Sequence, residues 1–559
     1  MSASAPRPSS VATLPRREAR AISLRVWLRR GLLGLLWLLL AFAIGWLVAR
    51  EAKTSALQAR LLTALNERVA TTLVAGPSPD FRAPEHGPYD RRLGYVRLPE
   101  WTRRLVHDGF RVTEQTRFSP VLLQLDALGV SPPYREKTRT GLTVRDRRGN
   151  AIFAALEPRR GYADYAAIPP LVRDTLLFVE NRELLVPEAR RNPAVEWDRL
   201  AHAVLFQLGG GDGEGRGPGG STLATQMEKY RHSPGGRTHS PFEKLRQIGS
   251  ASLRAYREGD DTTAVRQAIL LDYLNSLPLA AVPGRGEVLG LAAGLEAWYG
   301  ADFDRTNELL VAWVDPRDGA GQAEQARAYR EVLSLLLSTR RPTDYLRERP
   351  DALDELADRY LRRLVREGVI PRELGAAALR VRPRRGTTPP PKKPFVGPAE
   401  PVRRWLVGAL ALPDYYALDR LDLDAVSTLD TSLQAVIEGR LEGLADPAVV
   451  ARAGLRAKGL LEDDDPAGVI YSFALYERVG DASRLRVSAD NFGGALDVNE
   501  GVKLDLGSTA KLRALASYLE VVASLHEELS GSAPAALLER HGASKMHALR
   551  RRDRHDRHA

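Results

Sequence analysis

The longest apolar stretch of the chain lies near its N-terminus. Residues 31–49 form a 19-residue run without a charged side chain, which is long enough to cross a bilayer as a helix. Arg25, Arg29 and Arg30 precede the run, and this excess of positive charge predicts a cytoplasmic N-terminus. Because the run is longer than the core of a cleaved signal peptide, we expect an uncleaved signal anchor. The bulk of the chain is then expected outside the cytoplasm.

Behind this run, the pattern predicts a helix over 51–75 and a small α+β region over 77–133. Residues 140–156 alternate around a turn-forming Arg-Arg-Gly-Asn sequence, which predicts a β-hairpin. Apolar stripes at helical spacing over 197–208 and 353–365 indicate a mainly α region between Glu180 and Leu374.

Seven prolines over 381–401 predict an extended linker. After it, residues 425–429 and 467–476 are typical of strands, and a helix is expected from about Ser508.

The composition and the distribution of charge exclude several kinds of functional site and partner. The 559 residues are 44% hydrophobic and 27% charged, which suits two to four globular domains. The absence of cysteine excludes disulfides, thiolate zinc sites and cysteine nucleophiles, and the ten histidines show no metal-binding spacing. Of the net charge of +11, residues 1–30 carry +6 and residues 545–559 carry +4. The charge therefore lies at the ends of the chain, which argues against a nucleic-acid partner.

The glycine-rich stretch 209–220 contains a match to the dinucleotide-binding pattern G-x-G-x-x-G. The match follows a predicted helix rather than a strand, so the context that the pattern requires is missing. A flexible loop that leads into a helix is the better interpretation.

The segment after this loop is more specific. Residues 219–238 read GGSTLATQMEKYRHSPGGRT and resemble the second signature of the family 51 glycosyltransferase domain of class A penicillin-binding proteins. The positions kept are Gly219, Gly220, Ser221, Thr222, Gln226, Lys229, Arg237 and Thr238. The chain departs from the signature at Ala224, Thr225 and Tyr230.

Three further segments resemble this family in the same order. They are 168–182, with Glu180, Asn181 and Arg182; 266–275, which ends in Tyr-Leu-Asn275; and 341–368. The resemblance implies a mainly α, lysozyme-like domain that joins lipid II units into glycan strands by an inverting reaction. It further implies that Glu180 is the general base, that Lys229 and Arg237 bind the leaving pyrophosphate, and that the other kept positions, with Asn181 and Asn275, contact substrate.

Two departures from the family lie at catalytic positions. The family's Asp after the first Glu is Asn181, and the second catalytic Glu aligns with Gln247. Glu243, one helical turn earlier, is a candidate replacement for that carboxylate. These changes keep a second hypothesis open, in which the chain is an inactive envelope scaffold that binds glycan or lipid II.

The C-terminal segment resembles part of a penicillin-binding transpeptidase. Residues 426–434 (VSTLDTSLQ) resemble the start of that domain, and Ser508 and Lys511 form an S-x-x-K motif. At this spacing on a helix, Lys511 could take a proton from Ser508. No S-x-N or K-T-G follows in this sequence, so we expect no transpeptidase activity.

Together these patterns predict a membrane-anchored multidomain protein, in which a mainly α glycosyltransferase domain precedes an incomplete α/β transpeptidase fragment. The expected segments are a cytoplasmic basic tail (1–30), the anchor (31–49), a membrane-proximal α+β region (50–139), the glycosyltransferase domain (140–380), the linker (381–401), the partial transpeptidase domain (402–544) and a basic tail (545–559). Expected partners are lipid II, nascent glycan strands, the bacterial inner membrane and other cell-wall synthesis proteins, with the bulk of the chain in the periplasm. No cofactor is identified, and the reaction is compatible with a divalent cation.

Overall fold

The computed structural model describes residues 16–133, 137, 139–199, 201, 221–311, 319–386, 397–492, 507–531, 533, 536, 539 and 542. The chain divides into two compact units. Unit 1 comprises residues 1–437 and 475–487, and unit 2 comprises residues 438–474 and 488–559.

The apolar run lies in a single long helix, α1 (Arg16–Thr54). Its segment Arg29–Thr54 is long and apolar enough to cross a membrane, and none of it is buried in the protein. Ser55 adopts a left-handed backbone with φ of 52°, which ends α1 and redirects the chain into α2 (Ala56–Asn66). The helix expected over 51–75 is therefore wrong in its second half, because residues 71–75 form the strand β1 (Thr71–Ala75).

The region that follows is α+β, as predicted. Strand β1 pairs antiparallel with β2 (Glu114–Phe118). Three helices complete this region: α3 (Pro88–Arg92), α4 (Leu98–His107) and α5 (Pro120–Ala127).

The predicted hairpin is confirmed as β3 (Thr140–Arg145) and β4 (Ala151–Glu157), which pair antiparallel. Asp146 stabilises the turn by accepting hydrogen bonds from the backbone N–H groups of Arg148 and Asn150, both at 2.8 Å. A third strand, β7 (Leu423–Val426), joins β3 in parallel, so that the sheet order is β4-β3-β7. Helices α16 (Glu400–Ala409) and α17 (Tyr415–Asp419) pack against this sheet through a shared apolar cluster.

The largest core lies in the helical part of unit 1, which confirms the mainly α expectation. Its helices are α6 (Pro170–Glu180), α8 (Leu223–His232), α9 (Pro241–Ala255), α10 (Thr263–Ser276), α11 (Gly290–Gly294), α12 (Phe303–Leu310), α13 (Gly319–Ser338), α14 (Pro350–Arg366) and α15 (Arg372–Arg380). A small hairpin of β5 (Pro278–Val282) and β6 (Gly286–Leu289) lies between α10 and α11.

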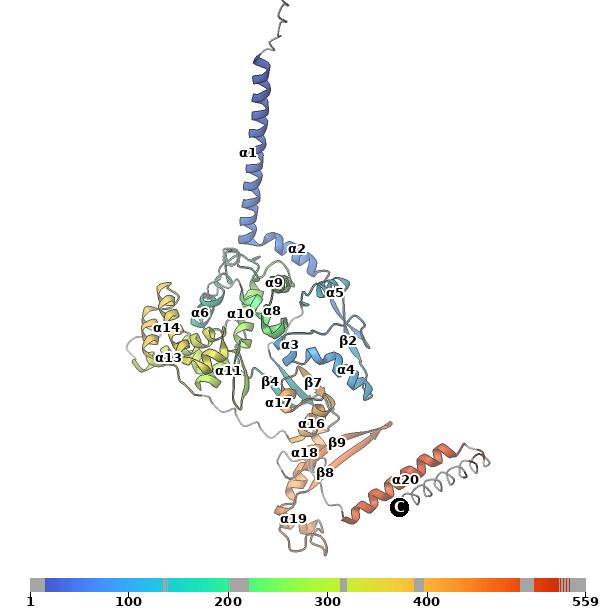
Figure 1. The fold of residues 1–559 in the computed structure, drawn as a ribbon. Helices are drawn as coiled ribbons and strands as arrows, with labels where there is room; N and C mark the ends of the chain where they lie inside the picture. The colour runs from blue at the N-terminus through green and yellow to red at the C-terminus, as the bar shows by residue number, and fades with distance from the viewer. Residues whose placement is uncertain are drawn as a thin grey trace, which may run out of the picture. The chain divides into compact units, whose positions relative to one another are not determined.

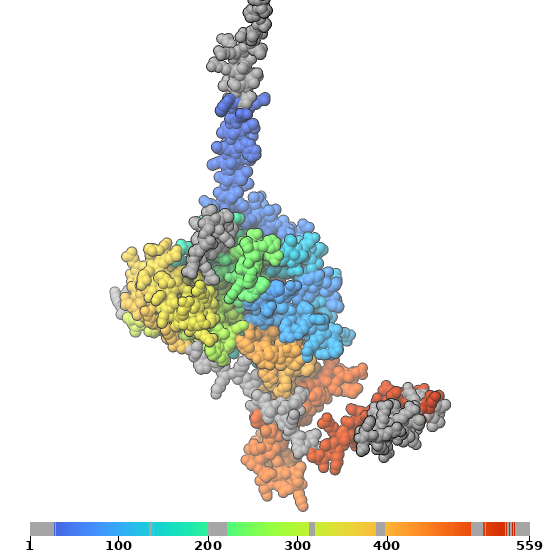
Figure 2. Space-filling model, viewed as in Figure 1, coloured from blue at the N-terminus to red at the C-terminus, as the bar shows by residue number. Residues whose placement is uncertain are grey.

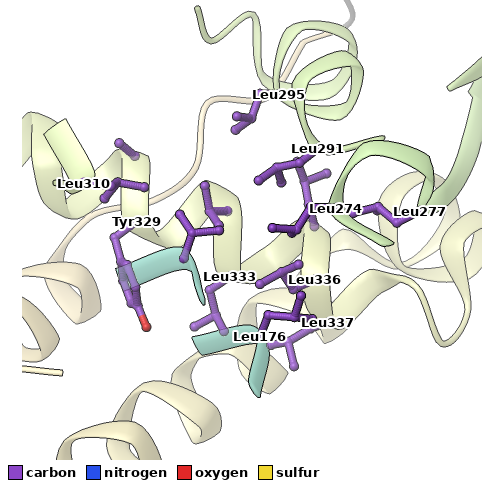
Figure 3. Close-up of a cluster of buried hydrophobic side chains, with 14 of the residues drawn as sticks. Leu176, Leu274, Leu277, Leu291, Leu295, Leu310, Tyr329, Leu333, Leu336 and Leu337 are labelled. Carbon is purple, nitrogen blue, oxygen red and sulfur yellow. The ribbon is translucent and has the colours of Figure 1, made fainter. Parts of the chain in front are cut away.

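Helix α13 is the centre of this core. Its side chains Leu333, Leu336 and Leu337 are buried and meet leucines of α6, α10 and α11 (Figure 3). Figure 1 shows α13 beside α14 and near α11. Because α6 and α10 both pack on α13, the last residues of α6 are held in a fixed place in the domain.

The C-terminal part contains α18 (Thr431–Gly443), α19 (Pro447–Arg452), the paired strands β8 (Ser472–Val479) and β9 (Ala482–Asp490), and α20 (Ala510–Leu529). The helix expected near Ser508 is thus confirmed. None of the residues of α20 is buried.

Candidate active site

Glu180 is the last residue of α6, and its side chain is only 7% exposed. Its Oε2 atom accepts a hydrogen bond of 2.9 Å from Gln226 Nε2. Its Oε1 atom is buried and has no hydrogen-bond partner among the described residues. The cation that approaches Oε1 among the described residues is Arg340, whose Nη2 atom lies 3.8 Å away. We call Glu180, Gln226, Lys229 and Arg340 the Glu180 cluster.

Helix α8 supplies two members of this cluster. It begins with a capping box, in which Thr222 and Thr225 each accept a hydrogen bond from the other's backbone N–H. Gln226 and Lys229 lie three residues apart and so share one face of this helix. Burial lowers the pKa of Lys229, and the negative charge of Glu180 opposes this effect. The two side chains are therefore close enough for their charges to interact.

Asn181 positions the start of α8 from the other side. Its Oδ1 atom accepts a hydrogen bond of 3.0 Å from the backbone N–H of Leu223, and its Nδ2 group donates to the buried Glu196. An amide can do both, whereas an ionised carboxylate only accepts. Asn181 thus suits a position between an N–H donor and a carboxylate. Arg199 completes the arrangement by donating to Glu196 and, at 2.6 Å, to the backbone oxygen of Glu180.

A second polar group lies where α9 meets the start of α8. Lys244 of α9 donates through Nζ to Ser221 Oγ at 2.7 Å and to Thr225 Oγ1 at 3.3 Å. Burial, with smaller contributions from the charges of Lys229 and Arg199, lowers the pKa of Lys244 to about 8. Two half-buried lysines therefore lie near each other, and Lys229 also lies near the Glu180 carboxylate. This arrangement suits a dianionic group. Figure 2 shows the α8–α9 segment in green at the surface of unit 1, beside residues of the α+β region in blue.

Gln247, also on α9, holds the loop that follows α8. Its Nε2 group donates to Ser233 Oγ and to Thr238 Oγ1, both at 3.0 Å, and its Oε1 atom accepts from Thr238 at 3.1 Å. Arg237 lies in this loop next to Thr238, with an exposed side chain. Glu243 accepts a hydrogen bond from the backbone N–H of His239 at 2.7 Å, at the start of α9.

Asn275 lies apart from these groups. Its side chain makes two hydrogen bonds of 2.9 Å with the backbone of Tyr162. The Oδ1 atom accepts from the N–H group, and the Nδ2 group donates to the carbonyl oxygen. It borders a cavity of about 410 Å³ whose lining includes Tyr162, Phe303 and Arg160 and no member of the Glu180 cluster.

The remaining predicted positions divide into two groups. Gly219 and Gly220 lie outside the described residues, as does most of the stripe over 197–208. Ser508 lies in a short 3-10 turn (Gly507–Thr509) and Lys511 in the first turn of α20, and both are exposed.

Sequence reasoning missed Lys244 and Arg340. Lys244 could have been found from the sequence, because it precedes Gln247 by three residues and so shares a face of the same helix. Arg340 could not have been found from the sequence, since it lies in a turn after α13 and approaches Glu180 only through the packing of α13 on α6.

Comparison with known proteins gives one family. Residues 148–364 match the family model described as transglycosylase. This range contains the Glu180 cluster and also Lys244 with its partners Ser221 and Thr225, and it ends within α14. A search of curated proteins found no match.

Proposed function

Residues 148–364 form a transglycosylase domain, the domain of peptidoglycan glycosyltransferases, and we propose that it polymerises lipid II with Glu180 as the general base. The observation that carries this proposal is the state of Glu180: a buried carboxylate with one oxygen held by Gln226 and the other without a donor among the described residues. A general base needs such a free oxygen within reach of the hydroxyl whose proton it accepts.

The reaction follows from the chemistry of the substrates. The 4-hydroxyl of the acceptor sugar transfers its proton to Oε1 of Glu180 while its oxygen attacks the anomeric carbon of the donor. A new C–O bond forms, the bond from the anomeric carbon to the lipid pyrophosphate breaks, and the electron pair leaves with the pyrophosphate. Attack opposite to the leaving group inverts the anomeric centre.

The leaving pyrophosphate needs positive charge as the bond breaks. Lys229 and Lys244 supply it from two helices, and Ser221 and Thr225 orient the Lys244 ammonium group. Arg237, exposed in the loop that Gln247 holds, is the third cation proposed for this site. In this view Asn181 acts through α8 and not by contact with substrate, because its amide is already used by Leu223 and Glu196.

The membrane-facing side of the domain is proposed from the position of the anchor. Arg191 donates to the backbone oxygen of Ala52 at the end of α1, and Asn192 donates to Gln58 of α2 at 2.9 Å. The exposed apolar residues near this junction include Leu61 of α2 and Phe242 of α9. A single-pass anchor in the bacterial inner membrane, with unit 1 in the periplasm, would keep the Glu180 cluster near a lipid-embedded substrate.

The finer assignment to class A penicillin-binding proteins is also a proposal. It is supported by the 426–434 segment and by the S-x-x-K spacing of Ser508 and Lys511 at the start of α20.

The test is lipid II consumption by the detergent-solubilised chain beside the Glu180→Gln variant. We expect polymer from the wild type and a loss of at least 100-fold in the variant, with lipid II binding retained. No polymer from a folded wild type that still binds lipid II would contradict the proposal and favour a scaffold that recognises lipid II.

A further inference from the structure

The two oxygens of the Glu180 carboxylate have different surroundings. Oε2 is fixed by Gln226, while Oε1 is buried and lacks a donor among the described residues. A buried carboxylate oxygen without a partner is unfavourable. The cation that approaches it is Arg340, at 3.8 Å from Nη2 to Oε1. This distance is too long for a direct hydrogen bond.

Arg340 is held in this place by the end of the central helix. Thr339 donates through Oγ1 to the backbone oxygen of Leu336, and the N–H of Arg341 donates to Ser338, so the turn after α13 is closed by local bonds. The guanidinium group of Arg340 also lies over the ring of Tyr360 of α14, 5.6 Å from its centroid. One end of the side chain is thus packed, while 45% of it stays exposed.

Besides Arg199, which donates to the backbone oxygen of Glu180, the charged and titratable groups that face this residue come from three elements. Lys229 approaches from α8, together with the neutral Gln226. Tyr273 approaches from α10, and burial, with a smaller contribution from the negative charge of Glu180, raises its pKa. Arg340 approaches from the turn after α13, and it is the cation on the side of the free oxygen.

We propose that Arg340 is a positioning residue for the general base: its positive charge attracts Oε1 of Glu180 and directs this oxygen toward the acceptor hydroxyl. The inference rests on the proposed glycosyltransferase function. The 3.8 Å gap leaves Oε1 free to accept the proton, whereas a direct Arg–carboxylate bond would occupy its lone pairs. After the transfer Glu180 is neutral, so the attraction to Arg340 is lost and the carboxyl can release the proton to water.

The experiment measures kcat and KM for lipid II consumption by the full-length, detergent-solubilised chain. The variants are Arg340→Gln, which removes the charge, and Arg340→Lys, which keeps it. The matched control is Arg341→Gln, because Arg341 is the adjacent exposed arginine and faces Asp344 at 3.9 Å instead of Glu180. Arg340→Met, which keeps the stem over Tyr360, replaces Arg340→Gln if the latter does not fold.

We expect Arg340→Gln to lower kcat by roughly 3–10-fold with KM for lipid II unchanged, since the partner is half exposed and its effect is screened. Arg340→Lys and Arg341→Gln should keep the wild-type kcat.

Equal kcat values for Arg340→Gln and the wild type would overturn the inference. A loss of kcat of equal size in both Arg340 variants would overturn it as well, because it would indicate a packing role over Tyr360. A folded wild type without any polymer would instead refute the proposed function on which the inference rests.

Discussion

Lys244 Nζ lies 2.7 Å from Ser221 Oγ, so a hydrogen bond joins α9 to the residue that precedes the capping box of α8. Through this contact the ammonium group of Lys244 reaches the start of α8. The same group is also close enough to Lys229 for their charges to repel each other. An anion bound near both lysines would offset this repulsion, and the pyrophosphate of the substrate would be such an anion.

The low pKa of Lys244 predicts a basic limb in the rate profile. With a pKa of about 8, the side chain carries its charge below pH 8 and loses it as the pH rises through that value. Because kcat/KM reports the free enzyme, we expect kcat/KM to fall above about pH 8. In Lys244→Arg, which stays charged, this fall should disappear.

Removal of the charge in Lys244→Ala should lower kcat/KM by roughly 100-fold at pH 7. Lys458→Ala, at an exposed lysine of unit 2, serves as the control and should leave the rate unchanged. A basic limb that persists in Lys244→Arg would show that another group produces it.

Gln247 is predicted to act through the Arg237 loop and not as a damaged catalytic carboxylate. Gln247→Ala removes the bonds to Ser233 and Thr238, so KM for lipid II should rise by roughly 10-fold, which is about the value of one neutral hydrogen bond. Gln247→Glu should stay within about 3-fold of the wild type, because both hydroxyls can turn to donate to a carboxylate. Initial rates at several lipid II concentrations separate KM from kcat. Equal losses in the two variants would contradict the positioning role.

Asn275 is predicted to stabilise the fold without contact to substrate. Asn275→Ala leaves the backbone groups of Tyr162 without their partner, which should lower the free energy of unfolding by about 2 kcal/mol. A decrease in the melting temperature of about 4–8 °C is the expected sign, with KM for lipid II unchanged. An increase in KM at an unchanged melting temperature would instead restore the substrate contact that the family resemblance implies.

The pair of Asp90 and His232 is predicted to fasten the α+β region to α8. Asp90 is fully buried, and its Oδ2 atom lies 2.8 Å from His232 Nδ1 at the end of α8. Asp90→Ala should cost about 2–4 kcal/mol of stability. Asp80→Ala breaks the exposed pair with Arg117 and should cost less than about 1 kcal/mol. Thermal unfolding compares the two variants, and equal effects would refute the fastening role.

The sequence by itself determined the features that depend on local pattern. The membrane-length run of α1, the turn of the β3–β4 hairpin and the stripe of α14 each follow from the identity of residues close together in the chain. The signature segments also pointed to Glu180 and Lys229, since residues of one catalytic signature lie close together in sequence. The helix expected over 51–75 is interrupted at Ser55, where the backbone is left-handed, and it ends at Asn66, because residues 71–75 form β1.

Only the tertiary structure decided which distant groups meet. In the parallel ladder of β3 and β7, Leu142 pairs with Leu423. This pairing joins a segment that precedes the helical domain in the sequence to one that follows it. Arg340 reaches Glu180, and Lys244 reaches Ser221, because α13 and α9 pack against elements from other parts of the chain. Such contacts depend on the burial of apolar faces over many residues at once, and a local pattern carries no record of which face meets which.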